Sequence, residues 1–180
     1  MHPTPFLNNY LIRPIIQSDA AGYFKLIDAN RPRLEDFFAG TLSKTKTLKD
    51  TEDFVAANIK RREEKTYYPF VIIDTTTQTI IGYIDVKSID WKIPKAEFGC
   101  FLAKEALGHG VSKQAMQIVI DHLFNELGFT KLFLRTHLTN KEARGLAERL
   151  GFLQEGVLRK DYRTTNGTLV DLVYYGLLKP

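Results

Sequence analysis

The long amphipathic segment at residues 111–127 constrains the fold of this chain more than any other feature. Its apolar residues, among them Val119 and Leu123, recur at helical spacing along one side, whereas Lys113 and Gln117 lie on the opposite side. Gly128 follows at the position where a glycine commonly ends a helix. The pattern therefore predicts a long helix that packs one face against a core.

Segments rich in β-branched and aromatic residues lie on both sides of this helix. Residues 96–102 (AEFGCFL) precede it and residues 131–137 (KLFLRTH) follow it as predicted strands. Residues 68–74 and 79–89, joined by the turn TTTQ, predict one hairpin, and the segment TNGT predicts another near the end of the chain. The remaining predicted strands are residues 10–16, where Pro14 indicates a sheet edge or a strand end, residues 152–162 and residues 169–178.

Three further helices are predicted in the first half of the chain. They lie around residues 18–29, 31–40 and 50–65, and Ser18 is the expected N-cap of the first. The apolar stripe of the third is loose, so its limits rest mainly on its composition.

A short helix is predicted at residues 140–151. Thr139 and Glu142 have the spacing of a capping box at its start, and Gly151 ends it. The order of the predicted elements is strand, helices, three strands, long helix, strand, helix and hairpin. This order indicates an α/β (α+β) fold in which helices pack on a mixed sheet.

The composition is that of one compact domain spanning residues 1–180. Of the 180 residues, 44% are hydrophobic, and neither a repeat nor a flexible linker interrupts them. No window approaches the roughly 20 uninterrupted apolar residues of a membrane helix, and the start of the chain lacks the pattern of a signal peptide. One cysteine excludes an internal disulfide. We expect a cytoplasmic protein that does not bind membranes.

Charge and histidine placement exclude two kinds of site. The net charge is +4, but the lysines and arginines are scattered, and the cluster KRREEK carries its own acids. This cluster is typical of a solvated helix face, so direct nucleic-acid binding is not expected. The four histidines are dispersed and none pairs with a cysteine at zinc spacing, so no metal site is expected. Cys100 is interpreted as a core residue because no base is positioned to activate it.

Two glycines, Gly108 and Gly110, precede the long helix directly. Bare backbone at a helix start suits a tight turn, but it also suits a bound phosphate, because the first N–H groups of a helix have no internal partner. A Walker loop is absent. A dinucleotide-binding loop would need a small residue where Lys113 stands.

The segment EALGHG resembles the pyrophosphate loop of the GNAT superfamily, the acyl-CoA-dependent N-acetyltransferases, whose pattern is Gln/Arg-x-x-Gly-x-Gly/Ala. Glu105 stands where glutamine or arginine is usual. The second half of the chain is similar to the ribosomal-protein N-acetyltransferase branch of that superfamily, the RimJ/RimL type. The matching residues are Asn140, Ala143, Glu148, Arg149, Gly151, Phe152, Glu155, Gly156, Leu158, Arg159, Gly167, Asp171 and Tyr174.

This resemblance implies a single GNAT-like domain. Its mixed central sheet would have about six to seven strands, with splayed central strands, helices on both faces and a C-terminal hairpin. It also implies acetyl-CoA as the acyl-donor co-substrate. The backbone of Phe101, Leu102 and Ala103 would pair with the pantetheine arm. The backbone amides of Leu107, Gly108, His109, Gly110, Val111 and Ser112 would hold the pyrophosphate, and Asn140 would contact the pantetheine region.

Some of these residues also have structural interpretations. Leu107 can belong to the core, His109 can be merely exposed to solvent, and Asn140 can cap the helix that follows it.

Glu97 is the candidate general base, acting through a water molecule. It matches a glutamate that serves as base in several members of the superfamily, although it could instead pair with Lys92 or Lys95. An N–H group near Phe101 or Leu102 would stabilise the oxyanion. An N-terminal amine, with a pKa of about 7.7–8.0, needs less help from a base than a lysine does.

The usual general acid of the superfamily is missing from this chain. Ala147 stands where many relatives have a tyrosine, and Ala143 stands where some members of the branch have a serine. Tyr162, Tyr174 and Tyr175 are alternatives that the spacing does not separate, and water alone could also assist departure of the thiolate. Tyr162 is retained as the candidate.

Three hypotheses for function follow. The first is acetyl transfer to a primary amine, foremost the N-terminus of a protein of the ribosomal-protein type. The second is acetylation of a small amine, such as a polyamine or an aminoglycoside-like compound. The third is a non-catalytic acyl-CoA-binding domain. The resemblance implies a monomer or a homodimer.

Overall fold

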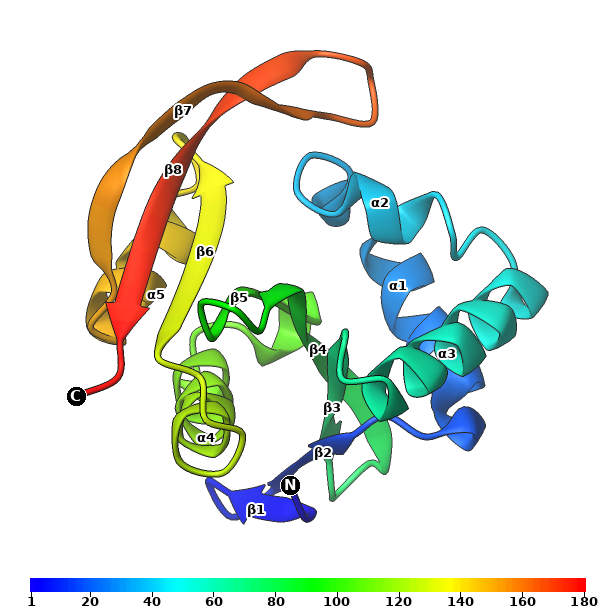
Figure 1. Cartoon of the computed structure of the whole chain (residues 1–180). Helices are drawn as coiled ribbons and strands as arrows, with labels where there is room; N and C mark the ends of the chain where they lie inside the picture. The colour runs from blue at the N-terminus through cyan, green and yellow to red at the C-terminus, as the bar shows by residue number, and fades with distance from the viewer.

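The computed structural model describes residues 1–180 and contains one open sheet of eight strands in the order β1-β2-β3-β4-β5-β6-β8-β7 (Figure 1). Only β5 and β6 are parallel; every other neighbouring pair is antiparallel. The strands are β1 (Thr4–Phe6), β2 (Tyr10–Pro14), β3 (Tyr68–Asp74), β4 (Thr79–Asp90), β5 (Lys95–Leu102), β6 (Lys131–His137), β7 (Leu153–Arg163) and β8 (Leu169–Leu178).

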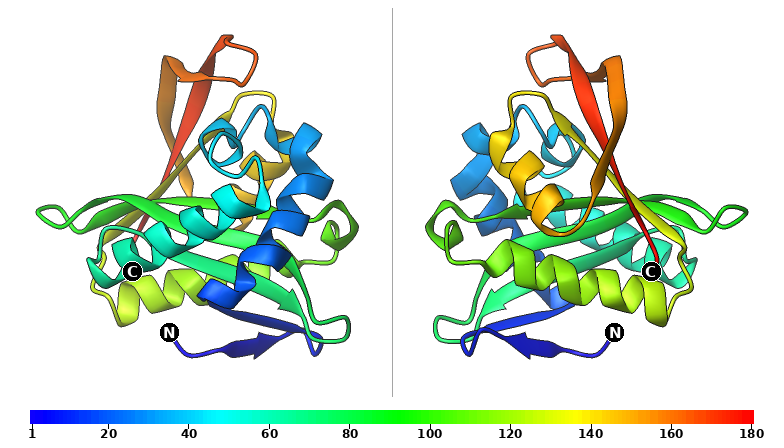
Figure 2. Two further views of the ribbon diagram at one scale, coloured as in Figure 1. Left: turned by 90° about the vertical axis from the view of Figure 1, so that its right-hand side faces the viewer. Right: turned by 90° about the vertical axis from the view of Figure 1, so that its left-hand side faces the viewer.

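Helices cover both faces of the sheet, as Figure 2 shows with α1 and α3 on one side and α4 on the other. Each side has its own apolar core. The helices are α1 (Ala20–Leu34), α2 (Ala39–Leu42), α3 (Leu48–Glu63), α4 (Val111–Asn125) and α5 (Lys141–Arg149), and two 3-10 turns lie at Gln17–Asp19 and Lys104–Ala106. None of these helices is both long and apolar enough to cross a membrane.

The predicted long helix is α4, and its limits are set by two glycines. Gly110 occupies the N-cap position with φ 74°, and Gly128 follows the helix with φ 78°. Both values lie in the left-handed region that favours glycine. The side chains of Ala115, Val119 and Leu123 are fully buried. The helix is thus held against the sheet by the stripe that the sequence pattern predicted.

The two central strands separate soon after they pair. β5 and β6 share only the pairs Lys95–Lys131, Ala96–Leu132 and Glu97–Phe133. Beyond Glu97, β5 continues along β4 to Leu102, whereas β6 continues along β8. The outer backbone edge of β5 is therefore left without a partner strand, and the expected splay is confirmed.

Several details differ from the predictions. The sheet has one strand more than the upper expected number, because the short β1 pairs with β2 near the start of the chain. The helix expected at residues 31–40 does not form as a unit. Residues 31–34 complete α1 instead, since Pro32 falls in the last turn, where few hydrogen bonds remain to be lost.

Two predicted helix caps were also wrong. Ser18 lies inside the first 3-10 turn, where the Asp19 carboxylate accepts the Ile16 N–H instead. Thr139 bonds to the ring of His137, and Asn140 is the N-cap of α5, where its Oδ1 accepts the Ala143 N–H at 3.1 Å.

Candidate active site

A cavity of about 390 Å³ opens between the splayed strands and the segment that connects α1 to α3. Glu97, Asn140 and Tyr162, which the sequence singled out for chemistry, all line it. Asp85, Lys87 and Arg135 line it as well. These six charged or polar residues come from β4, β5, β6, β7 and the N-cap of α5, and the fold brings them to one place.

The glycine turn before α4 presents unpaired backbone N–H groups. No N–H between Gly108 and Lys113 donates a hydrogen bond within the protein; the first that does is that of Gln114, to the Gly110 carbonyl at 3.1 Å. A Cβ added at Gly108 or Gly110 would meet nothing within 4 Å, so the turn faces open space. These donors, at the positive end of a helix, fit a diphosphate.

The side chains of this turn divide between core and solvent. Val111 is buried and Leu107 packs against the larger core, while Ser112 is half-buried. His109 is exposed, and so is Glu105, the residue that departs from the superfamily pattern. The backbone of the turn, rather than its side chains, therefore supplies the donors for an anion.

The free edge of β5 can be assigned residue by residue from its bond with β4. The Ala103 N–H donates to the Ile81 carbonyl at 2.7 Å. Because neighbouring residues of an antiparallel strand point their polar groups in opposite directions, Phe101 also faces β4, whereas Cys100 and Leu102 face the gap. The Leu102 carbonyl there accepts a hydrogen bond from Arg33 Nη1 at 3.3 Å. The Phe101 ring packs in the smaller core.

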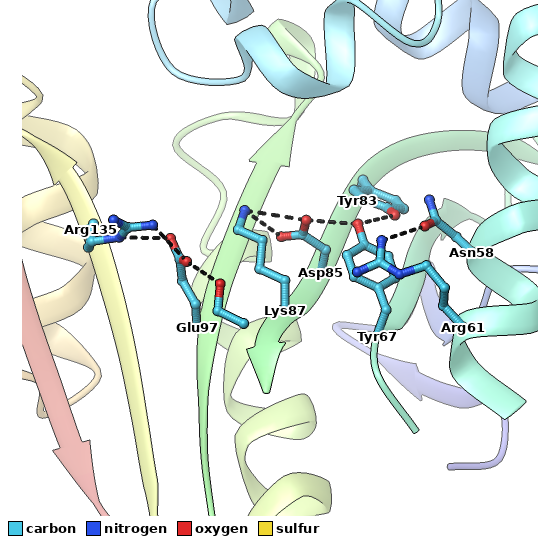
Figure 3. Close-up of polar contacts among 9 residues, drawn as sticks. Asn58, Arg61, Tyr67, Tyr83, Asp85, Lys87, Glu97 and Arg135 are labelled. Atoms are coloured by element: carbon cyan, nitrogen blue, oxygen red, sulfur yellow. Dashed lines mark hydrogen bonds and ion pairs between the residues drawn. The ribbon is translucent and has the colours of Figure 1, made fainter. Parts of the chain in front are cut away.

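Glu97 is buried and held by donors from two strands (Figure 3). Arg135 donates to its two oxygens at 3.2 and 3.0 Å, and Ser88 Oγ donates at 2.9 Å. Ser88 has φ 51° and lies where the register of β4 and β5 shifts, and this bulge turns its hydroxyl toward Glu97. The ion-pair partner of Glu97 is therefore Arg135, and not Lys92 or Lys95 as the sequence suggested.

Arg135 bridges the point where β5 and β6 separate. Its Nη1 also donates to Asp161 at 2.7 Å. Burial opposes the charge of the guanidinium, but the hydrogen bonds and charges of Glu97 and Asp161 outweigh burial and raise the pKa of Arg135. The base of the splay thus carries a permanent cation between two carboxylates.

A second group of polar side chains, which the sequence analysis missed, lies next to Glu97 on β4 and on the residue before β3 (Figure 3). Its members are Tyr67, Tyr83, Asp85 and Lys87. Tyr67 donates to Asp85 at 2.8 Å, and Lys87 Nζ lies 3.4 Å from both Asp85 oxygens. The hydroxyl of Tyr83 lies 3.0 Å from that of Tyr67, over whose ring the Arg61 guanidinium stacks. One sequence signal could have revealed the group, since Tyr83, Asp85 and Lys87 alternate with apolar residues in a strand that is covered on both faces.

Burial and charge shift the pKa values of this group. Burial disfavours the ammonium of Lys87, but Asp85 and Glu97 stabilise it, and the pKa of Lys87 is raised. Burial raises the pKa of Tyr83, and Asp85 adds to the effect. The same two causes raise the pKa of Cys100 to about 12. Cys100 is half-buried beside the cavity and remains a thiol near neutral pH.

The three candidate tyrosines occupy different places. Tyr162 lines the cavity, and its oxygen accepts the Ala39 N–H at 2.9 Å, which leaves its own proton without an acceptor in the protein. Tyr175 is buried and donates to Glu148 at 3.1 Å. Tyr174 stacks on Phe133 outside the cavity lining. Tyr162 is thus the tyrosine with a free proton beside the cavity.

The hairpin of β7 and β8 reaches across to the connection between α1 and α2 (Figure 1). Besides the bond from Ala39 to Tyr162, Thr165 donates to the Glu35 carbonyl at 2.6 Å. Phe37, in the same connection, lies edge-on to His137 at the end of β6. These contacts join the two sides of the splay above the cavity.

Comparisons with known proteins agree with this geometry. The acetyltransferase (GNAT) domain family matches residues 9–153. The chain is 38% identical over 101 residues to the "Putative ribosomal N-acetyltransferase YdaF" of Bacillus subtilis (strain 168), which covers 56% of this chain and 55% of YdaF. It is 26% identical over 170 residues to the "Probable N-acetyltransferase YjcK" of the same strain, covering 94% of this chain and 93% of YjcK.

A solved structure has the same fold over its whole length. The ribosomal-protein-S5-alanine acetyltransferase from Vibrio fischeri superposes with a TM-score of 0.89 at 21% identity, covering 99% of both chains.

Proposed function

This chain belongs to the GNAT acetyltransferase family, and we propose that it transfers the acetyl group of acetyl-CoA to a primary amine, foremost the N-terminal amine of a protein. The observation that carries the proposal is the splay of β5 from β6, which opens a cavity lined by both apolar and charged side chains, together with the turn of unpaired N–H groups that follows β5. Names of similar proteins, such as YdaF and the Vibrio fischeri enzyme, support a ribosomal protein as the source of the acceptor.

Acetyl-CoA would bind to what we call the donor region, residues 100–103 and 107–112. The amides of Gly108, His109, Gly110, Val111 and Ser112 would hold the diphosphate. The Leu107 N–H, which the sequence analysis included with them, donates instead to the Lys104 carbonyl at 3.3 Å. The pantetheine arm would run along β5 as an added strand. Because Leu102 faces the gap, its backbone would pair with the arm directly, while Phe101 and Ala103 shape the strand. Asn140 would contact the arm from the far side of the gap.

The reaction would proceed by direct attack of the amine on the thioester carbonyl. A carbon–nitrogen bond forms, and the carbon–sulfur bond breaks when the tetrahedral intermediate collapses. An N–H of β5 that faces the gap, from Cys100 or Leu102, would stabilise the oxyanion. The nitrogen loses a proton through water to Glu97, and the leaving thiolate takes a proton from Tyr162. Arg135 would keep Glu97 in place during these steps.

An N-terminal acceptor suits this arrangement for a chemical reason. Its pKa of about 7.7–8.0 leaves much of it neutral near physiological pH, whereas a lysine side chain, with a pKa of about 10.4, stays charged. Glu97 already accepts three hydrogen bonds, so it has little capacity left for direct contact with an amine. An acceptor that needs little help from a base is therefore favoured over a small amine of high pKa.

The test combines binding with turnover. Acetyl-CoA affinity is measured by calorimetry for the wild type, for Gly108→Val and for the control Gly128→Val. Both glycines have positive φ and open space around a Cβ, so backbone strain is matched. We expect at least a tenfold loss of affinity only for Gly108→Val. Unchanged affinity would contradict the placement of the diphosphate.

Turnover is then followed as free thiol released from acetyl-CoA in the presence of N-terminal peptides of ribosomal proteins, and separately with spermidine. Release with peptides supports the proposed acceptor. Release only with spermidine would assign a small amine instead, and binding without any release would identify a non-catalytic acyl-CoA-binding domain.

A further inference from the structure

Asp85 and Lys87 rest directly on the backbone of β5. In the register of β4 with β5, Asp85 lies opposite Gly99 and Lys87 lies opposite Glu97. A Cβ added at Gly99 would collide with Asp85 Oδ1 and would lie 3.2 Å from Lys87 Nζ. A glycine is therefore needed at position 99, because the ammonium and the carboxylate fill the space that any side chain would take.

The carboxylate of Asp85 is less fully engaged than that of Glu97. Tyr67 donates one good hydrogen bond at 2.8 Å, but Lys87 Nζ is 3.4 Å from each oxygen. Charge-assisted hydrogen bonds are usually about 2.7–2.9 Å long. Asp85 thus keeps capacity to accept further hydrogen bonds on the side that faces the cavity.

The two partners also differ in their freedom to move. The side chain of Asp85 is 7% exposed, whereas that of Lys87 is 33% exposed. Lys87 has a flexible four-carbon stem and opens toward the cavity, so it can leave its position, while Asp85 is fixed by Tyr67 and by burial. A primary ammonium therefore occupies a place from which it can be displaced.

This place is next to the strand that would carry the thioester. Gly99 immediately precedes Cys100, whose N–H faces the gap between β5 and β6. An amine at the position of Lys87 Nζ thus lies over the strand along which the acyl donor would run, on the face covered by α1 and α3. Among the other charged groups around it, Arg135 pairs with Glu97 (Figure 3) and with Asp161, while Arg61 stacks on the Tyr67 ring.

We propose that Asp85, supported by Tyr67, forms the subsite that receives the ammonium group of the acceptor, and that Lys87 occupies this subsite until the acceptor displaces it. The bound ammonium gives one proton to bulk water before its nitrogen attacks as the neutral amine, and the second proton leaves through water to Glu97. The inference rests on the proposed function, because it names where the acceptor binds in that reaction. It also predicts an ammonium site that exists whether or not acetyl transfer occurs.

The first experiment measures that site without any activity assay. Lys87→Ala removes the resident ammonium, and the melting temperature is recorded with n-butylammonium chloride or, as a control for ionic strength, tetramethylammonium chloride. We expect n-butylammonium to raise the melting temperature of Lys87→Ala by about 2–4 °C relative to the control salt. The double variant with Asp85→Asn should show no such rise.

An equal rise in the double variant, or no amine-specific rise in Lys87→Ala, would overturn the proposal. Lys87→Gln, which retains more of the stem, serves if the alanine variant does not fold, with the same expectations.

The second experiment measures the acceptor directly. Asp85→Asn should raise the acceptor KM at least tenfold while the affinity for acetyl-CoA stays within twofold, which also shows that the variant is folded. Lys87→Met should lower the acceptor KM, since it removes the competing ammonium. A raised KM in Lys87→Met would contradict displacement.

The two proposals fail in different ways. If acetyl-CoA does not bind, the proposed function fails, but n-butylammonium should still stabilise Lys87→Ala. If acetyl-CoA binds and turns over while Asp85→Asn leaves the acceptor KM unchanged, the subsite proposal alone fails.

Discussion

The donor region and the region opposite it differ in what they are made of. The donor region offers backbone groups, namely the free edge of β5 and the N–H groups of the glycine turn. The opposite region, which we call the acceptor region, consists of the side chains of Tyr67, Asp85, Lys87, Glu97 and Arg135. Its residues come from β4, β5, β6 and the residue before β3, whereas the donor region consists of two pieces that lie close together along the chain.

This difference suits the two substrates that the proposal assigns. Backbone N–H groups suit a ligand whose structure is constant, such as the diphosphate and pantetheine arm of coenzyme A. They remain in place when the side chains of the same residues are substituted. Side chains recognise whatever a particular acceptor presents, and each can change independently. The identity of the acceptor therefore depends on the acceptor region, and the five predictions that follow test whether the two regions can be separated.

The largest expected effect is on the alkylation rate of Cys100. Its backbone belongs to the donor region, and the charge of Asp85 helps to raise the pKa of its thiol. Burial and that charge raise its pKa to about 12, so far less thiolate exists at pH 8 than in the unfolded chain. We expect alkylation by iodoacetamide to be at least about a hundredfold slower in the native protein than in urea. Asp85→Asn should speed it. Mass spectrometry over time measures both rates, and equal native and unfolded rates would contradict the assignment.

Gly99→Val should disable the acceptor region alone. The added side chain collides with Asp85 and Lys87, so amine-dependent thiol release should fall about a hundredfold, and overpacking should cost about 1–3 kcal/mol of stability. Calorimetry should show acetyl-CoA affinity within twofold of wild type. Gly156→Val is the control, because a Cβ there meets nothing within 4 Å. Loss of acetyl-CoA affinity together with turnover would mean that the regions are coupled.

Arg135→Met, at the junction of the two regions, should lower the free energy of unfolding by about 2 kcal/mol, because it leaves Glu97 buried without its partner. The cost is smaller than for a fully buried ion pair because Arg135 is partly exposed. Lys131→Met, in the same strand, breaks the more exposed pair with Glu155 and should cost about 1 kcal/mol or less. Urea unfolding measures both free energies. Equal costs would show that the Glu97 pair has no special role.

Tyr162→Phe should lower kcat about tenfold if the hydroxyl supplies the proton to the thiolate. Loss of the hydrogen bond from Ala39 should cost about 1 kcal/mol of stability. Tyr174→Phe, whose ring lies outside the cavity, is the control and should leave kcat unchanged. If Tyr162→Phe changes only stability, the hydroxyl is a tether between the hairpin and the α1–α2 connection.

The smallest effect is expected at Asn140, the N-cap of α5. Asn140→Ala should cost about 1 kcal/mol through the lost cap and should weaken acetyl-CoA binding a few-fold. Asn140→Ser retains a capping oxygen, so it should recover the stability but not the affinity. Recovery of both would restrict Asn140 to its structural role.

Much of the fold could be predicted because it is encoded locally. The stripe that buries Val119 and Leu123, the glycine after α4 and the turn between β3 and β4 are all patterns of a few neighbouring residues. The errors fell where local signals compete. Ser18 and Thr139 both have side chains that commonly cap helices, but α1 has no side-chain cap, Asp19 accepts the Ile16 N–H, and Asn140 caps α5. Likewise, separate helices were expected at residues 18–29 and 31–40, but α1 continues through Pro32 to Leu34.

The sequence located the backbone part of the candidate site and three of its side chains, Glu97, Asn140 and Tyr162, but not the partners of those side chains. The glycine turn could be found from its spacing, but the partner of Glu97 could not, because Arg135 is distant in sequence and meets it only where two strands separate. Asp85 and Lys87 passed unnoticed for the same reason. In the sequence they are two polar residues that alternate with apolar ones, as in many strands. No neighbouring residue indicates that Gly99 lies opposite Asp85 and leaves space for both side chains.

The sequence by itself determined the family, the order of strands and helices and the donor turn, since each of these depends on residues that are close along the chain. Only the tertiary structure decided which charged side chains meet in the cavity, and that Asp85 rather than Glu97 can accept further hydrogen bonds. The physical reason is that backbone geometry is set by near neighbours, whereas the environment of a buried charge is set by every element that packs around it.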